Sequence, residues 1–405
     1  MPSLQHVVDY SDCSSASAEP DAASECVPVT DTQPQPNTTP PQTSTRDLAE
    51  LHDRLVAWLA TQLGDGADPT VSDLATPGSN GMSSETVLFD AAWTSGDGVR
   101  TEALVARLAP DPANLPVFPT YDLDNQFRAM QIVGDLGVAP VPPVFWSEPS
   151  PEPLGTPFIV MGRVEGIVPP DVMPYNFGDN WLFDASQEDQ QRLEDTSIAT
   201  LAALHGILDP EKTFSFLASS RPEATALERH VGATWDYYQW VAGDTPMPLI
   251  ERCFDWLRDH WPTEEGPTVL SWGDARIGNM MFRDFEPVAV LDWEMAGFGP
   301  PEIDVAWFIY LHRFFEDLTT NYGMPGMPDF LRRDRVAATY EKLTGYAPRD
   351  LDFFTMYAAL RQGIVMSRVQ HRAIHFGEAV MPDDIDDLIM HRATLEAMVA
   401  GTYWT

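Results

Sequence analysis

A pair of short apolar segments around a polar turn constrains this chain more than any other feature. The first, residues 269–282, reads Val-Leu-Ser-Trp-Gly-Asp-Ala-Arg-Ile-Gly-Asn-Met-Met-Phe, and the second, residues 288–294, reads Val-Ala-Val-Leu-Asp-Trp-Glu. Apolar runs of this length on either side of a short turn predict an antiparallel hairpin. Asn279 enters the first strand and Asp292 leaves the second, so the hairpin places the two side chains together at one end.

An amide oxygen and a carboxylate held together in this way favour magnesium bound to phosphate. Mg²⁺ usually takes one or two protein carboxylates and completes its shell with phosphate and water oxygens. Asp274 precedes Asn279 by five residues and can face the same point from the other side, where an acceptor hydroxyl would arrive. With thirteen further residues from Asn279 to Asp292, the spacing is that of the catalytic loop and metal-binding aspartate of protein kinases.

The chain up to about residue 186 alternates strand-like and helix-like segments. The chain after that residue is mainly helical and is interrupted by the hairpin at 269–294. A loop with two glycines, residues 77–86, leads into an apolar run. Backbone amides in such a loop can cover phosphates, because glycine lets the main chain approach a ligand closely. The expected elements are a helix at 51–63, strands at 87–93, 103–108 and 156–161, a helix at 121–135 and a hinge at 162–166.

These motifs together resemble the aminoglycoside phosphotransferase family, the kinase-like phosphotransferases of small molecules. That family's catalytic loop reads roughly His-Gly-Asp-x-x-x-x-Asn and is followed by an Asp-Trp metal motif. The matching residues are Gly273, Asp274, Asn279, Asp292 and Trp293, and the resemblance covers about residues 60 to 400. Within the family the chain is most similar to an actinobacterial branch linked to acyl-CoA dehydrogenases, in which the phrase Leu-Gly-Thr-Pro-Phe, here at 154–158, recurs.

The resemblance implies an α+β fold with two lobes, like that of protein kinases. Residues 46–161 are expected to form an N-terminal nucleotide-binding lobe around an antiparallel sheet. Residues 162–405 are expected to form a larger, mainly helical lobe that carries the catalytic hairpin and binds the substrate. Residues 1–45 contain no lysine or arginine and are rich in Pro, Ser and Thr, so we expect a disordered acidic tail there. ATP is expected to lie between the lobes.

The resemblance and the physics of phosphoryl transfer together give each motif a role in an ATP-dependent phosphotransferase that acts on a hydroxyl of a small molecule. Asp274 is the expected catalytic base, and Asn279 and Asp292 are the expected ligands of Mg²⁺. Arg107 would steady the α- and β-phosphates. Further nucleotide contacts are expected from Gly81, Met82, Ser83 and Ser84 in the glycine loop and from Val160, Met161, Gly162 and Val164 at the adenine edge. Gln126, Asp304 and Trp272 are expected to support the site.

Three positions depart from the family's pattern. Kinase-like folds hold the nucleotide phosphates with a lysine on the third strand, but the only lysines are Lys212 and Lys342. Arg107 occupies the matching strand position, and a guanidinium can grip phosphate oxygens in a bidentate fork. Gln126 stands where the usual glutamate partner would be, and a hydrogen bond between Arg107 and Gln126 is expected. Trp272 replaces a frequent histidine that packs the loop, a role that tryptophan can fill.

Several neighbouring side chains have structural explanations. Asp304 opens an apolar helix and by analogy braces the catalytic loop from behind, although a carboxylate at this place also suits a helix N-cap. His205 is expected in the core or bracing the loop. Arg276 is expected to pair with an acid, with contact to the substrate as the alternative. Five aromatic residues are expected to pack between the C-terminal helices and in part to line an acceptor pocket: Trp235, Tyr237, Tyr238, Trp240 and Trp256.

The charge balance excludes several classes of partner. The chain has 61 acidic side chains against 24 lysines and arginines, a formal charge of −37, which would repel DNA, RNA and anionic membrane surfaces. The sequence shows no apolar run of about 18 residues and no basic leader. Its three cysteines, without metal-type spacing, favour a reducing compartment. We therefore expect a cytoplasmic monomer or homodimer with no nucleic-acid or membrane partner.

The identity of the acceptor stays open, as do two other classes of function. An acidic cleft would suit a polycationic aminoglycoside, but so acidic a chain makes almost any cleft negative. The branch resemblance points equally to a hydroxyacyl-CoA or another lipid-like metabolite, which would require exposed arginines near the C-terminal helices. The candidates for that contact are Arg361, Arg368, Arg372 and Arg392. The other classes are a non-catalytic nucleotide-binding relative and an interaction protein that acts through the acidic tail.

Overall fold

The opening helix of the folded part ends where the sequence pattern predicts and begins three residues earlier, at Leu48. The computed structural model describes residues 46–76, 84–96, 98–171 and 174–403, so the predicted tail at 1–45 lies outside the described residues. Helix α1 (Leu48–Leu63) begins at Asp47, whose carboxylate accepts hydrogen bonds from two backbone amides of the first turn, and it ends at Gly64. Its apolar face packs against a sheet, and the side chains that it buries there are Leu51, Leu55, Trp58 and Leu59.

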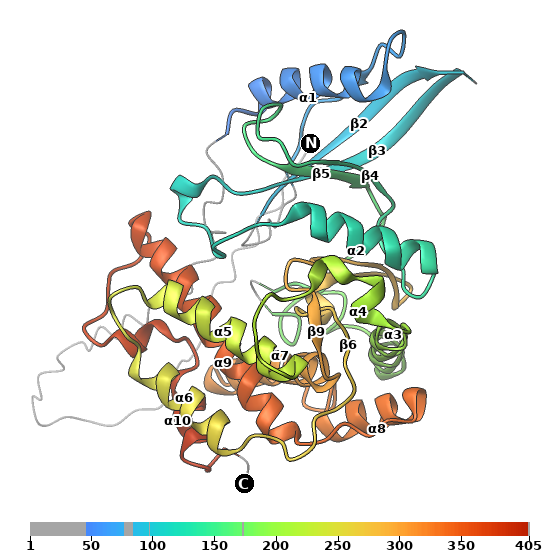
Figure 1. Cartoon of the computed structure of the whole chain (residues 1–405). Coiled ribbons are helices and arrows are strands. Elements are labelled where there is room, and N and C mark those ends of the chain that lie inside the picture. The colour runs from blue at the N-terminus through green and yellow to red at the C-terminus, as the bar shows by residue number, and fades with distance from the viewer. Residues whose placement is uncertain (1–45, 77–83, 97, 172–173, 404–405) are drawn as a thin grey trace, which may run out of the picture. The chain divides into compact units, whose positions relative to one another are not determined.

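That sheet has five antiparallel strands in the order β1-β2-β3-β5-β4 (Figure 1). Its strands are β1 (Thr70–Val71), β2 (Glu85–Ser95), β3 (Gly98–Leu108), β4 (Val144–Glu148) and β5 (Phe158–Gly162). The strands predicted at 87–93 and 103–108 are confirmed within β2 and β3, and the strand predicted at 156–161 is confirmed as β5, which begins two residues later. The sequence pattern does not predict β1 and β4, because β1 has only two residues and β4 shows no alternation of buried and exposed positions.

Side chains alternate between the two faces of β5 and so connect the sheet to two hydrophobic cores. Phe158 and Val160 join the cluster under α1, whereas Ile159 and Met161 join the larger cluster that continues into the helical part. Helix α2 (Leu123–Leu136) contributes its own buried side chains to that second cluster. It ends at Gly137, whose positive φ of 64° is a conformation that glycine adopts readily. The sheet thus has a helix on each face (Figure 1).

The chain beyond β5 is mainly helical, as predicted. Its helices are α3 (Gln187–His205), α4 (Pro210–Thr213), α5 (Ala226–Ala242), α6 (Pro248–Asp259), α7 (Glu302–Asn321), α8 (Arg333–Thr344), α9 (Leu351–His375) and α10 (Arg392–Val399). Two small sheets interrupt them: β6 (Val269–Ser271) pairs with β9 (Gly297–Gly299), and β7 (Met280–Arg283) pairs with β8 (Glu286–Val290). The described residues, from 46 to 403, belong to one compact unit, so the predicted lobe boundary at 161/162 stays a prediction.

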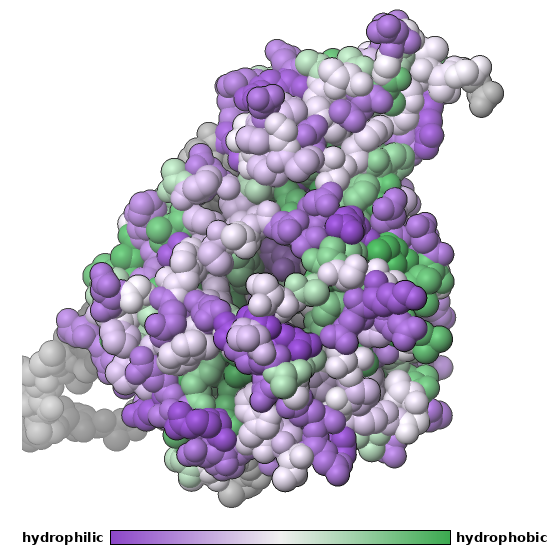
Figure 2. Space-filling model, in the orientation of Figure 1, coloured by the Kyte–Doolittle hydropathy of each residue, from purple (hydrophilic) through white to green (hydrophobic). Residues whose placement is uncertain are grey.

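The surface fits the acid-rich composition. The face shown in Figure 2 consists largely of hydrophilic residues, with hydrophobic ones in smaller patches. Across the described residues, no helix combines the length and the apolar character that crossing a membrane requires.

Buried histidines predict that the fold weakens in mild acid. Burial lowers the pKa of His391 to about 4, and burial likewise lowers the pKa of His312 to about 4 and that of His230 to about 3. The ordinary pKa is about 6.5, so below that pH the unfolded chain binds protons that the folded chain rejects. The contribution of these neutral histidines to the free energy of unfolding is therefore fully present above about pH 6.5, and it is lost progressively as the pH falls towards 4.

We expect the urea concentration at the midpoint of unfolding to decrease when the pH is lowered from 7 to 4.5. His391→Gln should make the slope of this decrease with pH smaller. Glutamine can replace the hydrogen bond of 2.8 Å between His391 Nε2 and the carbonyl oxygen of Ala359 but cannot be protonated. His260, which is exposed, provides the control, because His260→Gln should leave the slope unchanged. Equal slopes in the wild-type protein and in His391→Gln would contradict the assignment.

Candidate active site

The loop between β6 and β7 folds tightly against the segment that follows β8. Gly273 has a φ of 91°, and a Cβ atom there would lie 2.0 Å from the carbonyl oxygen of Met295. Only glycine fits such an approach. The loop that carries Asp274 therefore lies directly against the segment after Asp292, although eighteen residues of sequence separate the two aspartates.

Asp274 is held by three donors, and its carboxylate is largely buried. The indole Nε1 of Trp307 donates to Oδ1 at 2.7 Å, the amide of Asn279 donates to Oδ2 at 2.6 Å, and Nε of Arg276 donates to Oδ2 at 3.2 Å. Arg276 also pairs with Asp171, so the expected ion pair of Arg276 with an acid is confirmed. The sequence does not reveal that the acids are Asp274 itself and Asp171.

Asp304 braces the catalytic loop from behind. Its Oδ1 accepts from the Ser271 hydroxyl at 2.7 Å and from the Gly273 amide at 3.0 Å, and its Oδ2 accepts from the Trp272 amide at 2.7 Å. Burial would raise the pKa of this carboxyl, but these hydrogen bonds and the one from His205 outweigh burial, so the pKa is lowered. The loop-bracing interpretation is confirmed, whereas the N-cap interpretation is wrong: Pro301 stands at the N-cap of α7 and Asp304 lies inside the helix.

Two residues behind the loop play the structural parts expected of them. His205 lies buried between Asp304, 3.1 Å from Nε2, and the Tyr340 hydroxyl, 2.8 Å from Nδ1. Trp272 is fully buried, and its Nε1 donates to the carbonyl oxygen of Leu291 at 2.9 Å. Trp272 therefore ties the loop to the residue immediately before Asp292, which confirms that it packs and hydrogen-bonds the loop.

The predicted hairpin brings Asn279 and Asp292 to the same end. β7 and β8 pair in antiparallel register, and the Leu291 amide donates to the carbonyl oxygen of Asn279 at 2.8 Å. Asp292 has a φ of 58°, a conformation that costs energy for most side chains and occurs at functional sites. The Asn279 amide nitrogen is engaged with Asp274, which leaves its oxygen as a ligand. One amide oxygen and one carboxylate suit Mg²⁺, so the residues present fit the ion.

Arg107 reaches from β3 to this pair. Its Nη2 donates to Asp292 Oδ1 at 3.0 Å and to the Ser84 hydroxyl at 2.6 Å. Burial lowers the pKa of Arg107, but the charges of Asp292 and Glu294 outweigh this effect and raise it. The predicted hydrogen bond to Gln126 is wrong: within the described residues the guanidinium bonds to Ser84 and Asp292, and the buried Gln126 Oε1 has no partner there.

The remaining nucleotide contacts can be placed only in part. Gly81, Met82 and Ser83 lie outside the described residues, whereas Ser84 is buried beside Arg107. Val160, Met161 and Gly162 belong to β5, and the Gly162 amide donates to the carbonyl oxygen of Pro143 at 2.7 Å. Val164 follows the end of the strand and is partly exposed. The contact of these four residues with an adenine edge stays a prediction.

A cavity of about 680 Å³ opens beside the catalytic hairpin. Residues 293–298, which follow Asp292, form one wall, the start of α2 with Tyr121 and Gln126 forms another, and α5 with His230 and Tyr237 forms a third. The volume is typical of a site for a small organic ligand. Tyr237 is the member of the predicted aromatic set that lines it.

The arginines proposed for an acyl-CoA acceptor do not form an exposed cluster. Arg361 and Arg372 are buried, with 4% and 5% of their surface exposed. Arg368 stacks on Trp240 and donates to the carbonyl oxygen of Pro116, and Arg392 pairs with Asp384, Asp387 and Glu396. The prediction of exposed arginines for CoA phosphates is therefore wrong for Arg361 and Arg372, which α9 buries, whereas Arg368 and Arg392 are partly exposed but already engaged by the contacts just named.

The Trp307 contact, which the sequence does not reveal, predicts a measurable effect on catalysis. Trp307→Phe keeps an aromatic ring but removes the Nε1 donor to Asp274. Since a hydrogen bond to a charged group contributes roughly 1.5–3 kcal/mol, we expect kcat to fall about tenfold or more. KM for ATP should stay unchanged. Trp256→Phe, at a tryptophan that stacks on His260 away from the loop, is the matched control. A Trp307→Phe enzyme with the kcat of this control would contradict the positioning role.

Comparison with known proteins agrees with this arrangement. A model of the phosphotransferase enzyme family matches residues 75–351. Acyl-CoA dehydrogenase family member 10 of Mus musculus is 26% identical over 284 residues, which are 67% of this chain and 24% of that protein. The probable acyl-CoA dehydrogenase IBR3 of Arabidopsis thaliana is 25% identical over 312 residues, 69% of this chain and 34% of that protein. The chain thus spans about a quarter to a third of these relatives.

Solved structures share the fold. One from Ralstonia eutropha JMP134, classed provisionally as an aminoglycoside phosphotransferase, has a TM-score of 0.60 and 19% identity over 87% of this chain and 98% of that one. Aminoglycoside phosphotransferase APH(4)-Ia, solved as a ternary complex with AMP-PNP and hygromycin B, has a TM-score of 0.51 and 17% identity over 87% of this chain and 99% of that one. The predicted kinase-like α+β fold is confirmed. Because the family model matches more than half of its residues, the chain belongs to the phosphotransferase enzyme family.

Proposed function

We propose that the protein transfers the γ-phosphate of Mg-ATP to a hydroxyl group of a small molecule. The observation that carries the proposal is the meeting of Asp274, Asn279 and Asp292 at the end of one hairpin, with Arg107 across from them. Phosphoryl transfer requires a carboxylate that acts as the base, oxygen ligands for the metal ion and a cation for the phosphates, and these groups meet here. The nucleotide and antibiotic in the related APH(4)-Ia structure support the same combination of substrates.

Each side chain has a defined task in this proposal. Asp274 orients the acceptor hydroxyl and takes its proton as the oxygen bonds to the γ-phosphorus, while the bond from that phosphorus to the β–γ bridging oxygen breaks and ADP leaves. Asn279 and Asp292 would hold Mg²⁺, which neutralises charge on the phosphates. Arg107 exchanges its contact with Asp292 for phosphate oxygens, to which a guanidinium can donate in a bidentate manner.

The test is consumption of Mg-ATP by the full chain in the presence of candidate hydroxyl compounds. The panel contains aminoglycosides, macrolides, sugars, amino alcohols, hydroxy acids and hydroxyacyl-CoA thioesters, and Asp274→Ala is the blank. We expect at least one class to stimulate ADP release in the wild-type protein and none to do so in Asp274→Ala. A wild-type protein that binds the nucleotide but consumes none with any class would favour the non-catalytic alternative.

A further inference from the structure

Arg361 is an unusual cation in so acidic a chain. It lies on α9 with 4% of its surface exposed, and within the described part of the chain no carboxylate forms an ion pair with it. Its Nη2 donates to the carbonyl oxygen of Gly273 at 3.1 Å, whereas its buried Nη1 has no hydrogen-bond partner there. A buried charge without a charged partner is costly, although the chain contains 61 acidic residues that could have supplied one.

The position of Arg361 connects it to the proposed chemistry. Its guanidinium carbon lies 4.5 Å from the ring centroid of Trp307, the residue that holds Asp274. Arg361 also lines the cavity beside the catalytic hairpin. An anion bound to it from the cavity would therefore lie near the hydroxyl that Asp274 is proposed to deprotonate.

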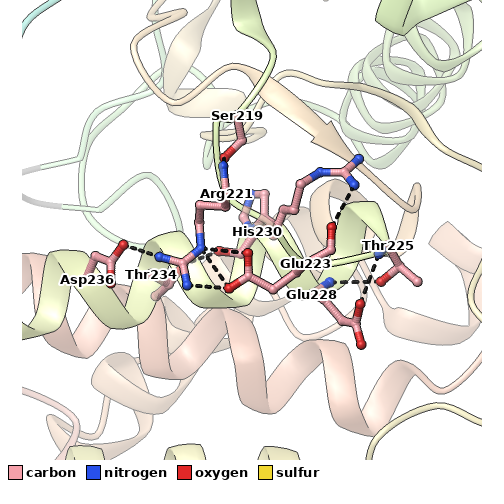
Figure 3. Close-up of polar contacts among 9 residues, drawn as sticks. Ser219, Arg221, Glu223, Thr225, Glu228, His230, Thr234 and Asp236 are labelled. Carbon is pink, nitrogen blue, oxygen red and sulfur yellow. Dashed lines mark hydrogen bonds and ion pairs between the residues drawn. The ribbon is translucent and has the colours of Figure 1, made fainter.

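The other arginines of the cavity differ from Arg361 because carboxylates already neutralise them. Arg221 pairs with Glu223 and Asp236, as Figure 3 shows, and Arg229 pairs with Glu211. Burial, with help from the charge of Arg361, lowers the pKa of His230 to about 3, so this neighbour is uncharged at neutral pH. Arg361 is thus left with positive charge to offer a ligand.

The acids of the cavity are engaged as well. Glu211 pairs with Arg229, and Asp122 caps α2 by accepting from the Asn125 amide at 3.0 Å. The charge of Glu294 acts on Arg107, whose pKa it helps to raise, and on the hydroxyls of Tyr121 and Tyr237. A polycation that entered the cavity would meet the positive charge of Arg361, which lines it.

We propose that the acceptor carries a compact anionic group, a carboxylate or a phosphate ester, which pairs with Arg361 and places a nearby hydroxyl at Asp274. This inference rests on the proposed function for the identity of the site. An arginine fork accepts both kinds of anion in a bidentate manner. The acceptor is then a hydroxy acid or a phosphorylated alcohol, and not a polycationic antibiotic.

The test compares matched compounds that differ only in charge. The probes are 3-hydroxybutyrate against 3-hydroxybutyramide, and glycerol 3-phosphate against glycerol, with inorganic phosphate and acetate as simple anions. The shift of the thermal unfolding midpoint is measured for the wild-type protein, Arg361→Gln and Arg361→Lys. We expect at least one anionic probe to bind the wild-type protein about tenfold more tightly than its neutral partner, the range of a hydrogen bond to a charged group. Arg361→Gln should lose this preference and Arg361→Lys should keep part of it, while affinity for AMP-PNP stays unchanged in both.

The possible outcomes separate the inference from the proposed function. Charge preference that disappears in Arg361→Gln supports the anion site, whether or not phosphate is transferred. If no probe distinguishes the wild-type protein from Arg361→Gln, the anion site is overturned even where neutral alcohols are phosphorylated. Loss of AMP-PNP binding in a folded Arg361→Gln protein would also overturn it, because Arg361 would then act on the nucleotide. Circular dichroism of both variants shows whether they fold, and Arg361→Lys keeps the test valid if Arg361→Gln does not.

Discussion

Asp274→Asn should lower kcat for phosphate transfer by about 100- to 10,000-fold, the range that a positioned general base contributes. Asparagine has nearly the same shape and its oxygen can still accept from Trp307, but its NH₂ group then faces the donors of Asn279 and Arg276, a mismatch whose effect on the fold is checked by urea unfolding of the variant. It cannot take the proton of the acceptor hydroxyl. KM for ATP should change little, because the proposed contact of Asp274 is with the acceptor.

The control for this change is Asp284→Asn in the turn between β7 and β8. Asp284 is exposed and has a φ of 51°, a conformation that asparagine tolerates as well as aspartate does. Its variant should retain the wild-type rate. Steady-state ADP release with an acceptor from the panel measures both variants. A rate for Asp274→Asn within about threefold of Asp284→Asn would mean that proton transfer to Asp274 contributes little to the barrier.

Asp304→Asn should lower the free energy of unfolding by about 3 to 5 kcal/mol, the cost of removing one partner from a buried charged network. Both carboxylate oxygens accept hydrogen bonds: Oδ1 from Ser271 and Gly273, and Oδ2 from Trp272 and His205. An asparagine placed there must direct its NH₂ group at one of the two backbone amides, whichever way it turns. The loop would therefore lose acceptors and gain a donor facing a donor.

Asp317→Asn, on the same helix, is the matched control. Asp317 forms a partly exposed pair with Arg313 one turn away, and such pairs contribute about 1 kcal/mol or less. Urea unfolding of the two variants gives the comparison. If Asp304→Asn unfolds at the same urea concentration as Asp317→Asn, the carboxylate does not brace the loop as the hydrogen bonds indicate.

The parts of the site that are close in sequence were predictable. The hairpin follows from two apolar runs around a turn, and pairing then places Asn279 beside Asp292. The spacing of Asp274 and Asn279 is short enough for one loop to bring them together. The glycine at 273 permits the tight approach of that loop. These elements depend on local geometry, which the order of residues encodes directly.

The parts that depend on tertiary packing were not predictable. Arg107 and Asp292 lie 185 residues apart, so no local pattern could show that this pair displaces the expected bond to Gln126. The Trp307 contact with Asp274 arises because α7 packs behind the loop. Arg361 and Arg372 are charged residues, which usually lie at the surface, yet α9 buries both. Burial of a charged side chain is a property of the assembled core, which periodicity alone does not reveal.

The dependence of nucleotide binding on Mg²⁺ tests the central claim most directly. Asn279 and Asp292 are proposed to hold the metal of a metal–nucleotide complex, and in the structure Asp292 is paired with Arg107. The affinity for AMP-PNP is measured by calorimetric titration, once with Mg²⁺ and once with EDTA, for the wild-type protein and for Asp292→Asn. We expect the wild-type protein to bind about tenfold or more tightly with Mg²⁺, and Asp292→Asn to lose that gain. Equal binding with and without Mg²⁺ in the wild-type protein, unaffected by Asp292→Asn, would contradict the phosphotransferase mechanism.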